Sequence, residues 1–236
     1  MPEPTQRATV LRFRDLTPSV RELVLGPQQR KVSFAPGQWV SLRLPIGERP
    51  PLTRAYTMSE PESLAGELVL VFDRVPHGRG SQYLYTLKTG DVLELAGPYG
   101  TFIPPEPLTK DLLLVGRYTG LVPFHCMIRA LLARPPARMI ILLASAPSAI
   151  EQLYHEEFTA LAAAHATFRY VSLVERDEAG SVVNREQVIE ALAALGGEGP
   201  DVVPMICGIR SFVRPLREYF TARGFPRRAV RVETYD

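Results

Sequence analysis

The sequence predicts two domains, an antiparallel Greek-key β-barrel followed by a doubly wound α/β domain with a parallel five-stranded sheet. Two observations predict this fold. Residues 9–102 form short apolar or alternating segments separated by Pro- and Gly-rich turns, which is typical of antiparallel barrels. After residue 105, strand-like segments alternate with segments of helical period, which is typical of a parallel sheet covered on both faces. We therefore expect domains spanning 1–105 and 106–236.

Composition narrows the class of protein. Of 236 residues, 46% are hydrophobic and 22% charged, which suits a globular chain able to bury a core in each domain. The formal net charge is +2 without a basic run, so nothing indicates nucleic acid as a partner. No apolar run approaches the roughly 20 residues of a membrane span and no secretory signal opens the chain, so we expect a cytoplasmic protein. The two cysteines, Cys126 and Cys207, are too few for a four-cysteine metal site, and we expect no metal.

The first half contains four strand candidates, each apolar or alternating and each bounded by turn residues. They are Val20–Leu25, Trp39–Leu44, Glu67–Phe72 and Val92–Leu95. Helical period is almost absent here, and Ser81–Leu87 is the one candidate for a helical turn.

The second half contains five strand candidates whose near-continuous apolar character indicates burial on both faces. They are Leu112–Val115, Met139–Ala144, Phe168–Val174, Val202–Cys207 and Ala229–Glu233. We expect a helix over Ser148–Ala163, with Ile150, Leu153, Tyr154, Phe158 and Leu161 on one stripe. A capping box at residues 184–187 predicts the start of a further helix, with Val188, Leu192 and Leu195 facing the core.

A parallel sheet also predicts where a ligand binds, because the loops diverge at the carboxyl ends of its strands. Those ends carry Gly116–Gly120, Ser145–Pro147, Glu175–Arg176 and Cys207–Gly208. Small and polar groups at several ends suit a nucleotide crevice. From this half alone, an equally good interpretation is that Gly116 and Gly120 only form a turn.

Three segments of the first half indicate a phosphate-binding surface when they are taken together. In the RAYT strand, Arg54 and Tyr56 point to one face, and Ala55 and Thr57 to the other. A guanidinium can pair bidentately with a phosphate, and a phenol beside it can cover an aromatic ring. The turn at Gly78, Gly80 and Ser81 adds backbone donors and a hydroxyl. Taken singly, these residues have ordinary explanations: a surface ion pair, a core tyrosine and a hairpin turn.

The order PGQW, RAYT, GRGSQYL and GPYG resembles the flavin-binding barrel of the ferredoxin–NADP reductase family. The second half continues the resemblance with VGRYTGLVPF at the pyridine-nucleotide turn, PSAIEQLYHEEF at the next helix, ICGIRSF and VETY. The resemblance covers nearly the whole chain. It implies an FAD-dependent enzyme that passes hydride from NAD(P)H to the flavin, and then electrons to a separate acceptor.

The resemblance implies a role for each matching residue of the barrel half. Arg54 would neutralise the FAD pyrophosphate, with Gly78, Gly80 and Ser81 binding it through backbone and hydroxyl. Tyr56 would pack on the isoalloxazine and ribityl chain, with Ala55 beside it. Thr57 would place its hydroxyl near flavin N5.

In the second half, Gly116, Thr119 and Gly120 would line the nicotinamide side, and Cys207 with Gly208 would lie close to the hydride path. Glu233 and Tyr235 would close the other face of the flavin, and the ring of Tyr235 would move when nicotinamide enters. Thr57, Cys207, Glu233 and Tyr235 are thus the implied catalytic group.

The nucleotide turn departs from the family at Arg117 and Tyr118, which replace small residues. The fork of Arg117 can pair with a phosphate directly, and Tyr118 can stack on a ring or fill the groove. An alternative is therefore an FAD-binding electron-transfer subunit or interaction module whose crevice no longer turns over NAD(P)H. A barrel and nucleotide-binding domain without flavin is a third interpretation.

Two residues bear on the choice between NADH and NADPH, and the number of cysteines bears on the electron acceptor. Glu175 would repel a 2′-phosphate and suit a free ribose hydroxyl, whereas Arg176 argues the other way, which leaves a slight preference for NADH. The chain has two cysteines in all, too few for the four-cysteine cluster of an iron–sulfur domain. Any one-electron acceptor would therefore be a separate molecule: a ferredoxin, a Rieske-type component or another subunit.

Overall fold

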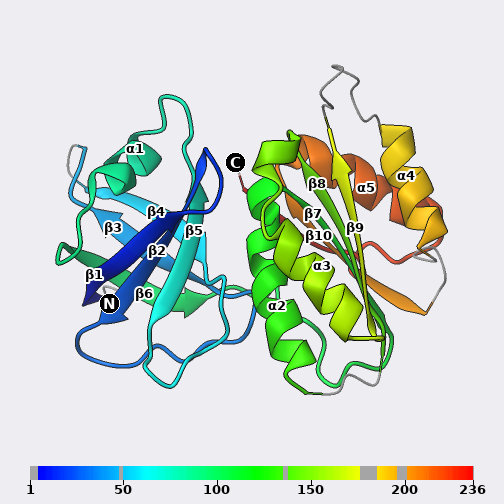
Figure 1. The fold of residues 1–236 in the computed structure, drawn as a ribbon, viewed down its shortest axis with the longest axis horizontal. Helices are drawn as coiled ribbons and strands as arrows, with labels where there is room; N and C mark the ends of the chain where they lie inside the picture. Colours follow the sequence, from blue (N-terminus) through cyan, green and yellow to red (C-terminus); the bar gives the residue numbers. More distant parts are fainter. Residues whose placement is uncertain (1–4, 48–49, 135–137, 176–184, 196–200, 236) are drawn as a thin grey trace.

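An antiparallel barrel and a parallel sheet lie side by side in the computed structural model (Figure 1), which describes residues 5–47, 50–134, 138–175, 185–195 and 201–235. The antiparallel strands end at Tyr99 and the parallel sheet begins at Asp111. Among the described helices, none is long and apolar enough to cross a membrane.

The first unit is a six-stranded antiparallel sheet with the order β4-β3-β6-β1-β2-β5. A bridge between Met58 and Leu70 links the two ends of this order, which makes the sheet barrel-like. Its core consists of inward side chains such as Val10, Leu23 and Leu42. The strands are β1 (Thr5–Asp15), β2 (Val20–Pro27), β3 (Trp39–Leu44), β4 (Leu52–Thr57), β5 (Leu68–Asp73) and β6 (Val92–Tyr99), with helix α1 (Arg79–Thr86) between β5 and β6.

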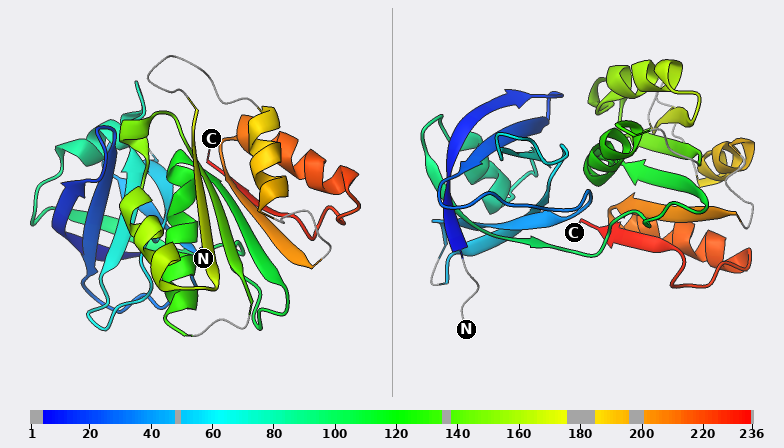
Figure 2. Two further views of the ribbon diagram at one scale, coloured as in Figure 1. Left: turned by 45° about the vertical axis from the view of Figure 1, so that its right-hand side comes forward. Right: turned by 90° about the horizontal axis from the view of Figure 1, so that it is seen from below.

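The second unit is a parallel sheet with the order β11-β10-β7-β8-β9. Helices α2 and α3 cover one face and α4 and α5 the other (Figure 2), and each face has its own apolar core. Its strands are β7 (Asp111–Arg117), β8 (Ile140–Ala146), β9 (Phe168–Val174), β10 (Val202–Gly208) and β11 (Arg231–Thr234). Its helices are α2 (Val122–Leu132), α3 (His155–Ala164), α4 (Arg185–Ala194) and α5 (Arg210–Ala222), with short 3-10 turns η1 (Tyr118–Leu121) and η2 (Ala149–Glu151).

The predicted fold class is confirmed, and all nine strand candidates are strands. Strand β1 was not predicted. Its second half carries exposed charged residues such as Arg12 and Arg14, which interrupt the alternation of buried and exposed residues that marks the first half. Val188 and Leu192 of α4, and Leu195 directly after it, are buried, which confirms the predicted inward face of this helix. Asn184 of the predicted capping box lies outside the described residues.

The prediction of one helix over Ser148–Ala163 is wrong. The chain forms η2, breaks, and restarts as α3 at His155. Tyr154 has a left-handed φ of 60°, which an α-helix does not accommodate, and Ile150 is 70% exposed instead of lying on the apolar stripe. The break turns the ring of Tyr154 onto that of His125, with centroids 3.8 Å apart, so a tertiary contact overrides the helical period.

Helix α2 forms the boundary with the barrel (Figure 2). The glycine of the PGQW motif permits its close approach. A Cβ on Gly37 would lie 2.0 Å from Phe102 O and 2.5 Å from the Met127 methyl, and its φ of 101° favours glycine. The motif therefore has a packing role between the two units.

Candidate functional site

The structure brings Thr57, Cys207, Glu233 and Tyr235 together where barrel and sheet meet. The parallel register of β10 and β11 places Glu233 beside Cys207. The Tyr235 amide donates to Gly208 O at 3.1 Å, and the Tyr235 hydroxyl lies 3.0 Å from Thr57 Oγ1. The last strand of one unit thus contacts the RAYT strand of the other.

Burial shifts the pKa values of three of these side chains. It raises the pKa of the Cys207 thiol, so this fully buried cysteine is a neutral thiol. It likewise raises the pKa of the Tyr235 phenol. Burial raises the pKa of Glu233 to about 7, which makes this carboxyl the group that can take up or release a proton near neutrality.

A second set of predicted residues meets at the start of α1. A Cβ on Gly80 would lie 3.2 Å from Arg54 Cγ, so the absence of a side chain at residue 80 leaves room beside the guanidinium. Arg54 is exposed and donates to Thr53 O at 2.8 Å. The first turn of α1 contains no acidic residue, and the first amides of a helix lack intrahelical partners. Arginine and free amides at one point suit a pyrophosphate.

The remaining residues of these motifs have structural contacts of their own. The Ser81 hydroxyl accepts from the Val75 amide at 3.2 Å and donates to Gly78 O at 3.1 Å, so it holds the turn together. A Cβ on Gly78 would lie 2.8 Å from Val75 Cβ.

Tyr56 packs on Phe72 at 5.7 Å between ring centroids, and burial raises its pKa to about 12. Ala55 is exposed on the opposite face of β4.

The glycines of the nucleotide turn make room for the protein itself. A Cβ on Gly116 would lie 2.7 Å from Leu121 and one on Gly120 would lie 2.4 Å from Cys207 O. Gly208 has a φ of 153° and adjoins the Arg117 side chain. Thr119 is half-buried in η1, between the two packed glycines.

In this structure the fork of Arg117, which we expect to be able to pair with a phosphate, is engaged by a carboxylate. Its Nε and one terminal nitrogen donate to the two oxygens of Glu175 at 2.6 and 2.7 Å. The Ser145 hydroxyl donates to the same carboxylate at 2.8 Å. The charge of Glu175 at the end of β9 is therefore compensated by Arg117. Arg176 lies outside the described residues.

Tyr118 takes part in a contact between the units that sequence reasoning missed. Its φ of 53° is left-handed, a conformation that favours glycine. Its hydroxyl bonds to the Ser19 hydroxyl in the β1–β2 turn and lies 3.4 Å from Glu151. Glu151 also accepts from Ser19 at 2.8 Å and from Thr17. No local pattern connects these four residues, because they come from three distant segments.

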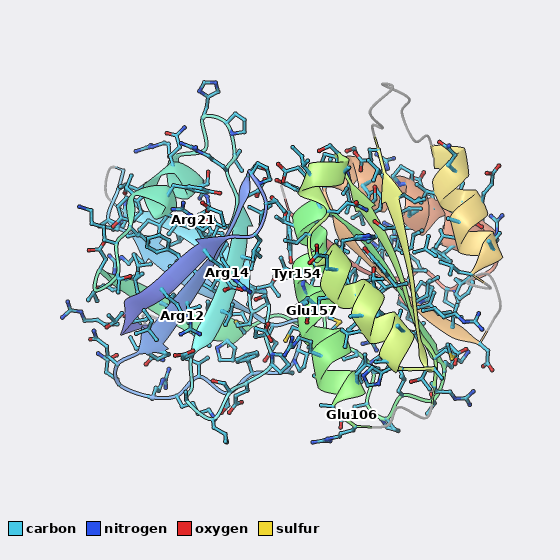
Figure 3. All side chains as sticks on the ribbon, viewed as in Figure 1. Arg12, Arg14, Arg21, Glu106, Tyr154 and Glu157 are labelled. Atoms are coloured by element: carbon cyan, nitrogen blue, oxygen red, sulfur yellow. The ribbon has the colours of Figure 1, made fainter. Side chains whose placement is uncertain are left out.

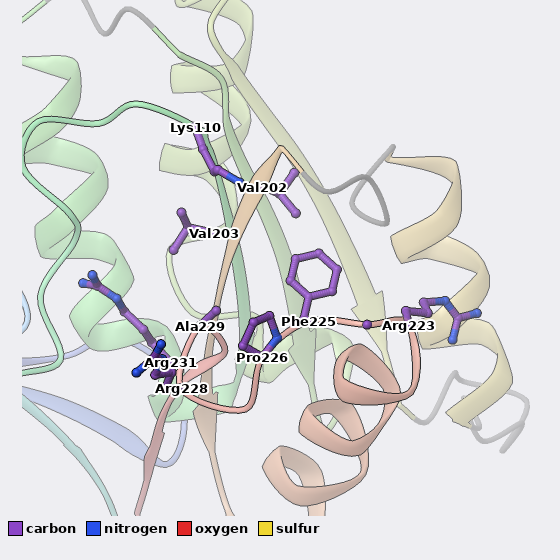
Figure 4. Close-up of a pocket in the computed structure, with 10 residues that line it drawn as sticks. Lys110, Val202, Val203, Arg223, Phe225, Pro226, Arg228, Ala229 and Arg231 are labelled. Atoms are coloured by element: carbon purple, nitrogen blue, oxygen red, sulfur yellow. The ribbon is translucent and has the colours of Figure 1, made fainter.

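A surface pocket of about 500 Å³ lies at the amino ends of the strands of the parallel sheet (Figure 4). Its lining includes Lys110, Val202, Phe225, Arg228 and Arg231, near the first residues of β7, β10 and β11. Ligands of open α/β sheets bind at carboxyl ends, so this pocket is separate from the candidate site.

The residues present fit FAD by two observations. One is the cradle beside Arg54 that a Cβ on Gly80 would fill, and the other is the Thr57–Tyr235 contact further along the same strand. Arg54 and the α1 amides would hold the pyrophosphate. Tyr56, Thr57 and Tyr235 would hold the ring system.

Known proteins place the chain among flavin-dependent reductases. The family described as the oxidoreductase FAD-binding domain matches residues 8–103. Ferredoxin–NADP reductase B of Sorangium cellulosum (strain So ce56) is 33% identical over 239 residues, which cover 97% of both chains. The reductase component of phenol 2-monooxygenase from Pseudomonas sp. (strain CF600) is 34% identical over 166 residues, covering 70% of this chain and 46% of that one.

Solved structures agree on the fold. The cytochrome P450 reductase of Amycolatopsis aligns with a TM-score of 0.81 at 26% identity, covering 98% of this chain and 70% of the other. A ferredoxin–NADP+ reductase from Neisseria gonorrhoeae, solved with FAD and NADP, aligns with a TM-score of 0.82 at 18% identity over 98% of both chains. The second likeness concerns the fold alone. From the full-length match and the FAD-binding domain together, the chain belongs to the ferredoxin–NADP reductase family of FAD-binding oxidoreductases.

Proposed function

We propose that this protein takes hydride from a reduced nicotinamide nucleotide onto FAD bound between barrel and sheet, and passes the electrons to a separate redox protein. When bound, the flavin supplies the conversion between two-electron and one-electron transfer. Arg54 and the α1 amides would bind the anionic part, Thr57 would present a hydroxyl to the ring, and Tyr235 would cover the ring in the absence of nicotinamide. Glu233 would hold or release the accompanying proton.

One observation carries this proposal. Strand β4 holds Arg54 beside Gly80 and, three residues later, holds Thr57 against Tyr235 of the other unit. A single strand thus contacts both an anion-binding turn and the last strand of the nucleotide-binding sheet.

We infer a slight preference for NADH. Glu175 lies at the carboxyl end of β9, with its carboxylate oriented by Arg117 and Ser145, and a carboxylate there suits ribose hydroxyls better than a 2′-phosphate. The name of the Sorangium relative, which specifies NADP, argues for the other nucleotide.

The acceptor is proposed to be a ferredoxin, a Rieske-type component or another subunit. Several relatives are named as reductase or electron-transfer components of oxygenases, including one for toluate 1,2-dioxygenase of which the chain covers 64%. The chain spans about half the length of the phenol hydroxylase components that it matches. A cytoplasmic location remains a prediction.

The test is an anaerobic titration of the FAD-loaded protein with NADH and separately with NADPH, followed by absorbance. We expect the oxidised flavin band to bleach with both nucleotides, and at lower concentration with NADH. A protein that stays colourless after FAD supplementation would overturn the flavin assignment. A flavin reduced by dithionite but by neither nucleotide would overturn the hydride step.

A second candidate function is an electron-transfer subunit with a closed nucleotide crevice, and the Tyr118 contacts favour it specifically. The tyrosine bridges η1 to the β1–β2 turn of the barrel. Tyr118→Gly suits the left-handed backbone and removes the ring, whereas Tyr118→Phe removes only the hydroxyl. If the crevice is closed, the Gly variant gains NAD(P)H reactivity. If Tyr118 is adapted to the nucleotide, the Gly variant loses affinity and the Phe variant loses less.

A further inference from the structure

A fully buried histidine on α2 joins the two units. His125 is 1% exposed, and both of its ring nitrogens have partners. Nδ1 lies 2.7 Å from Ser59 O of the barrel, and Nε2 lies 3.0 Å from a carboxylate oxygen of Glu157 on α3. The face of the ring stacks on Tyr154 with centroids 3.8 Å apart and planes 11° apart. Figure 3 shows Tyr154 and Glu157 on the barrel-facing side of the second unit.

The carbonyl partner determines the role of Nδ1. A carbonyl oxygen only accepts, so Nδ1 is the donor in the hydrogen bond between His125 and Ser59 O. Hydrogen bonds from His125 and then Arg129 hold the pKa of Glu157 at about 2, so an ionised carboxylate lies beside Nε2. These contacts and the stacked Tyr154 ring fix the orientation of the imidazole.

Charged side chains surround the ring. Glu60 lies 3.9 Å from His125 Nδ1, and Arg129 bonds to Glu60 at 2.9 Å and to Glu157 at 2.6 Å. Arg129 of α2 thus bridges a carboxylate of the barrel and a carboxylate of α3 beside His125. Glu60 and Arg129 line a surface pocket with Arg14 and Glu22, whereas His125 lies behind them, out of contact with water.

The barrel partner of His125 is close to the candidate site. Ser59 follows Thr57 by two residues, and its amide donates to Val69 O at 2.8 Å, which fixes the segment on β5. Thr57 in turn contacts Tyr235 at the end of β11. The Nδ1–H bond to Ser59 therefore links α2 to the end of β4 in the barrel. That end contacts Tyr235, which follows β11, the last strand of the parallel sheet that α2 covers.

We propose that His125 is a positioning residue that docks the nucleotide-binding unit on the barrel and, through Ser59, sets Thr57 opposite Tyr235. Glu157 and the ring of Tyr154 orient the imidazole, so that Nδ1 donates to Ser59 O. The change expected in the rate of flavin reduction rests on the proposed function. The results expected from NMR and from hydrogen exchange do not.

Two substitutions separate the two ring nitrogens. The amide of His125→Asn lies near the position of Nδ1 and can still donate to Ser59 O. The amide of His125→Gln reaches toward Glu157 and leaves Ser59 without its donor. His155→Gln is the matched control, because His155 is exposed on α3 and contacts Tyr170.

Three measurements use the full FAD-loaded protein. In ¹⁵N NMR at neutral pH, we expect Nδ1 of His125 to carry a proton. In hydrogen exchange, we expect the Tyr235 amide, which donates to Gly208 O, to exchange about tenfold faster in His125→Gln, with less change in His125→Asn. The Leu23 amide within the barrel is the reference and should not change. In stopped-flow reduction at saturating nucleotide, the rate constant should fall about tenfold for Gln and less for Asn, with KM within about twofold.

Each outcome bears on the proposal. An unprotonated Nδ1 of His125 in the wild type overturns it, and this measurement needs no variant that folds. Equal exchange at Tyr235 in Gln, Asn and control variants also overturns it. Equal losses in Asn and Gln would mean that the residue only contributes to stability. If dithionite reduces the flavin and neither nucleotide does, the proposed function fails, while the NMR and exchange results still decide the role of His125.

Discussion

Two glycine-containing turns of this protein resemble each other in sequence and differ in what the glycines accommodate. In the barrel turn, Gly80 leaves room beside the exposed guanidinium of Arg54. In the turn after β7, Gly116 and Gly120 leave room for Leu121 and for the backbone of Cys207. The neighbouring arginines differ in the same way, because Arg54 is exposed at its turn and Arg117 is held bidentately by Glu175.

The difference shows that a glycine between a strand and a helix has two physical uses. It admits a ligand where the space beside it opens to solvent, and it admits another part of the chain where that space is filled. The barrel turn is the better anion site of the two. A nucleotide at the second turn must approach over Tyr118 and Arg117, both already bonded to the protein.

The largest expected effect contrasts Gly120→Ala with Gly80→Ala. A Cβ on Gly120 would lie 2.4 Å from backbone, so we expect a loss of about 3 kcal/mol in the free energy of unfolding, measured in urea. A Cβ on Gly80 meets the flexible Arg54 at 3.2 Å, so stability should change by less than about 1 kcal/mol while FAD affinity falls. The comparison would not survive if Gly80→Ala were the less stable variant.

The next effect concerns Glu233, whose pKa burial raises to about 7 from its ordinary 4.5. Below pH 4.5 the carboxyl is protonated in both states. Between pH 4.5 and 7 the unfolded state ionises first, so this group lowers stability progressively, and the loss is complete above pH 7. Glu233→Gln should therefore match the wild type at pH 4 and exceed it by about 2 kcal/mol at pH 8. A constant difference across that range would contradict the shift.

Arg54→Ala and Arg117→Ala test the two arginines directly. Losing a charge-assisted bond at Arg54 should weaken FAD binding about tenfold or more, by flavin fluorescence in ultrafiltrates. Arg117→Ala should leave FAD binding unchanged and lower stability by about 1 to 2 kcal/mol, because Glu175 loses its partner. Unchanged FAD affinity in Arg54→Ala would remove the RAYT strand from the flavin site.

The smallest effect is expected for Ser145→Ala. The buried Ser145 hydroxyl donates to Glu175 at 2.8 Å, so its loss should cost about 1 kcal/mol of stability. FAD binding should not change, because Ser145 lies in the parallel sheet and not in the barrel. Thermal unfolding with and without added FAD measures both quantities, and Thr119→Ser in η1 is a mild control.

The strands and the two-domain order were predictable because apolar alternation and strand–helix period are local patterns. Helix 148–163 was not, because Tyr154 leaves the helical conformation to stack on His125, a contact across 29 residues of chain. For the same reason the sequence predicts separate ligand contacts for Arg117 and Glu175, which pair with each other in the structure. In the sequence nothing distinguishes an arginine that faces a ligand from one that faces a carboxylate 58 residues away.

The sequence by itself determined the fold class, the order of the motifs and the residue types able to bind a flavin. These depend on periodicity and on side-chain chemistry, which each residue carries wherever it lies. Only the tertiary structure decided which partners those side chains have: Thr57 with Tyr235, Arg117 with Glu175, Tyr118 with Ser19, and His125 with Ser59 and Glu157. Hydrogen bonds and ion pairs act over a few ångströms, so they form between segments that folding brings together and that no local pattern connects.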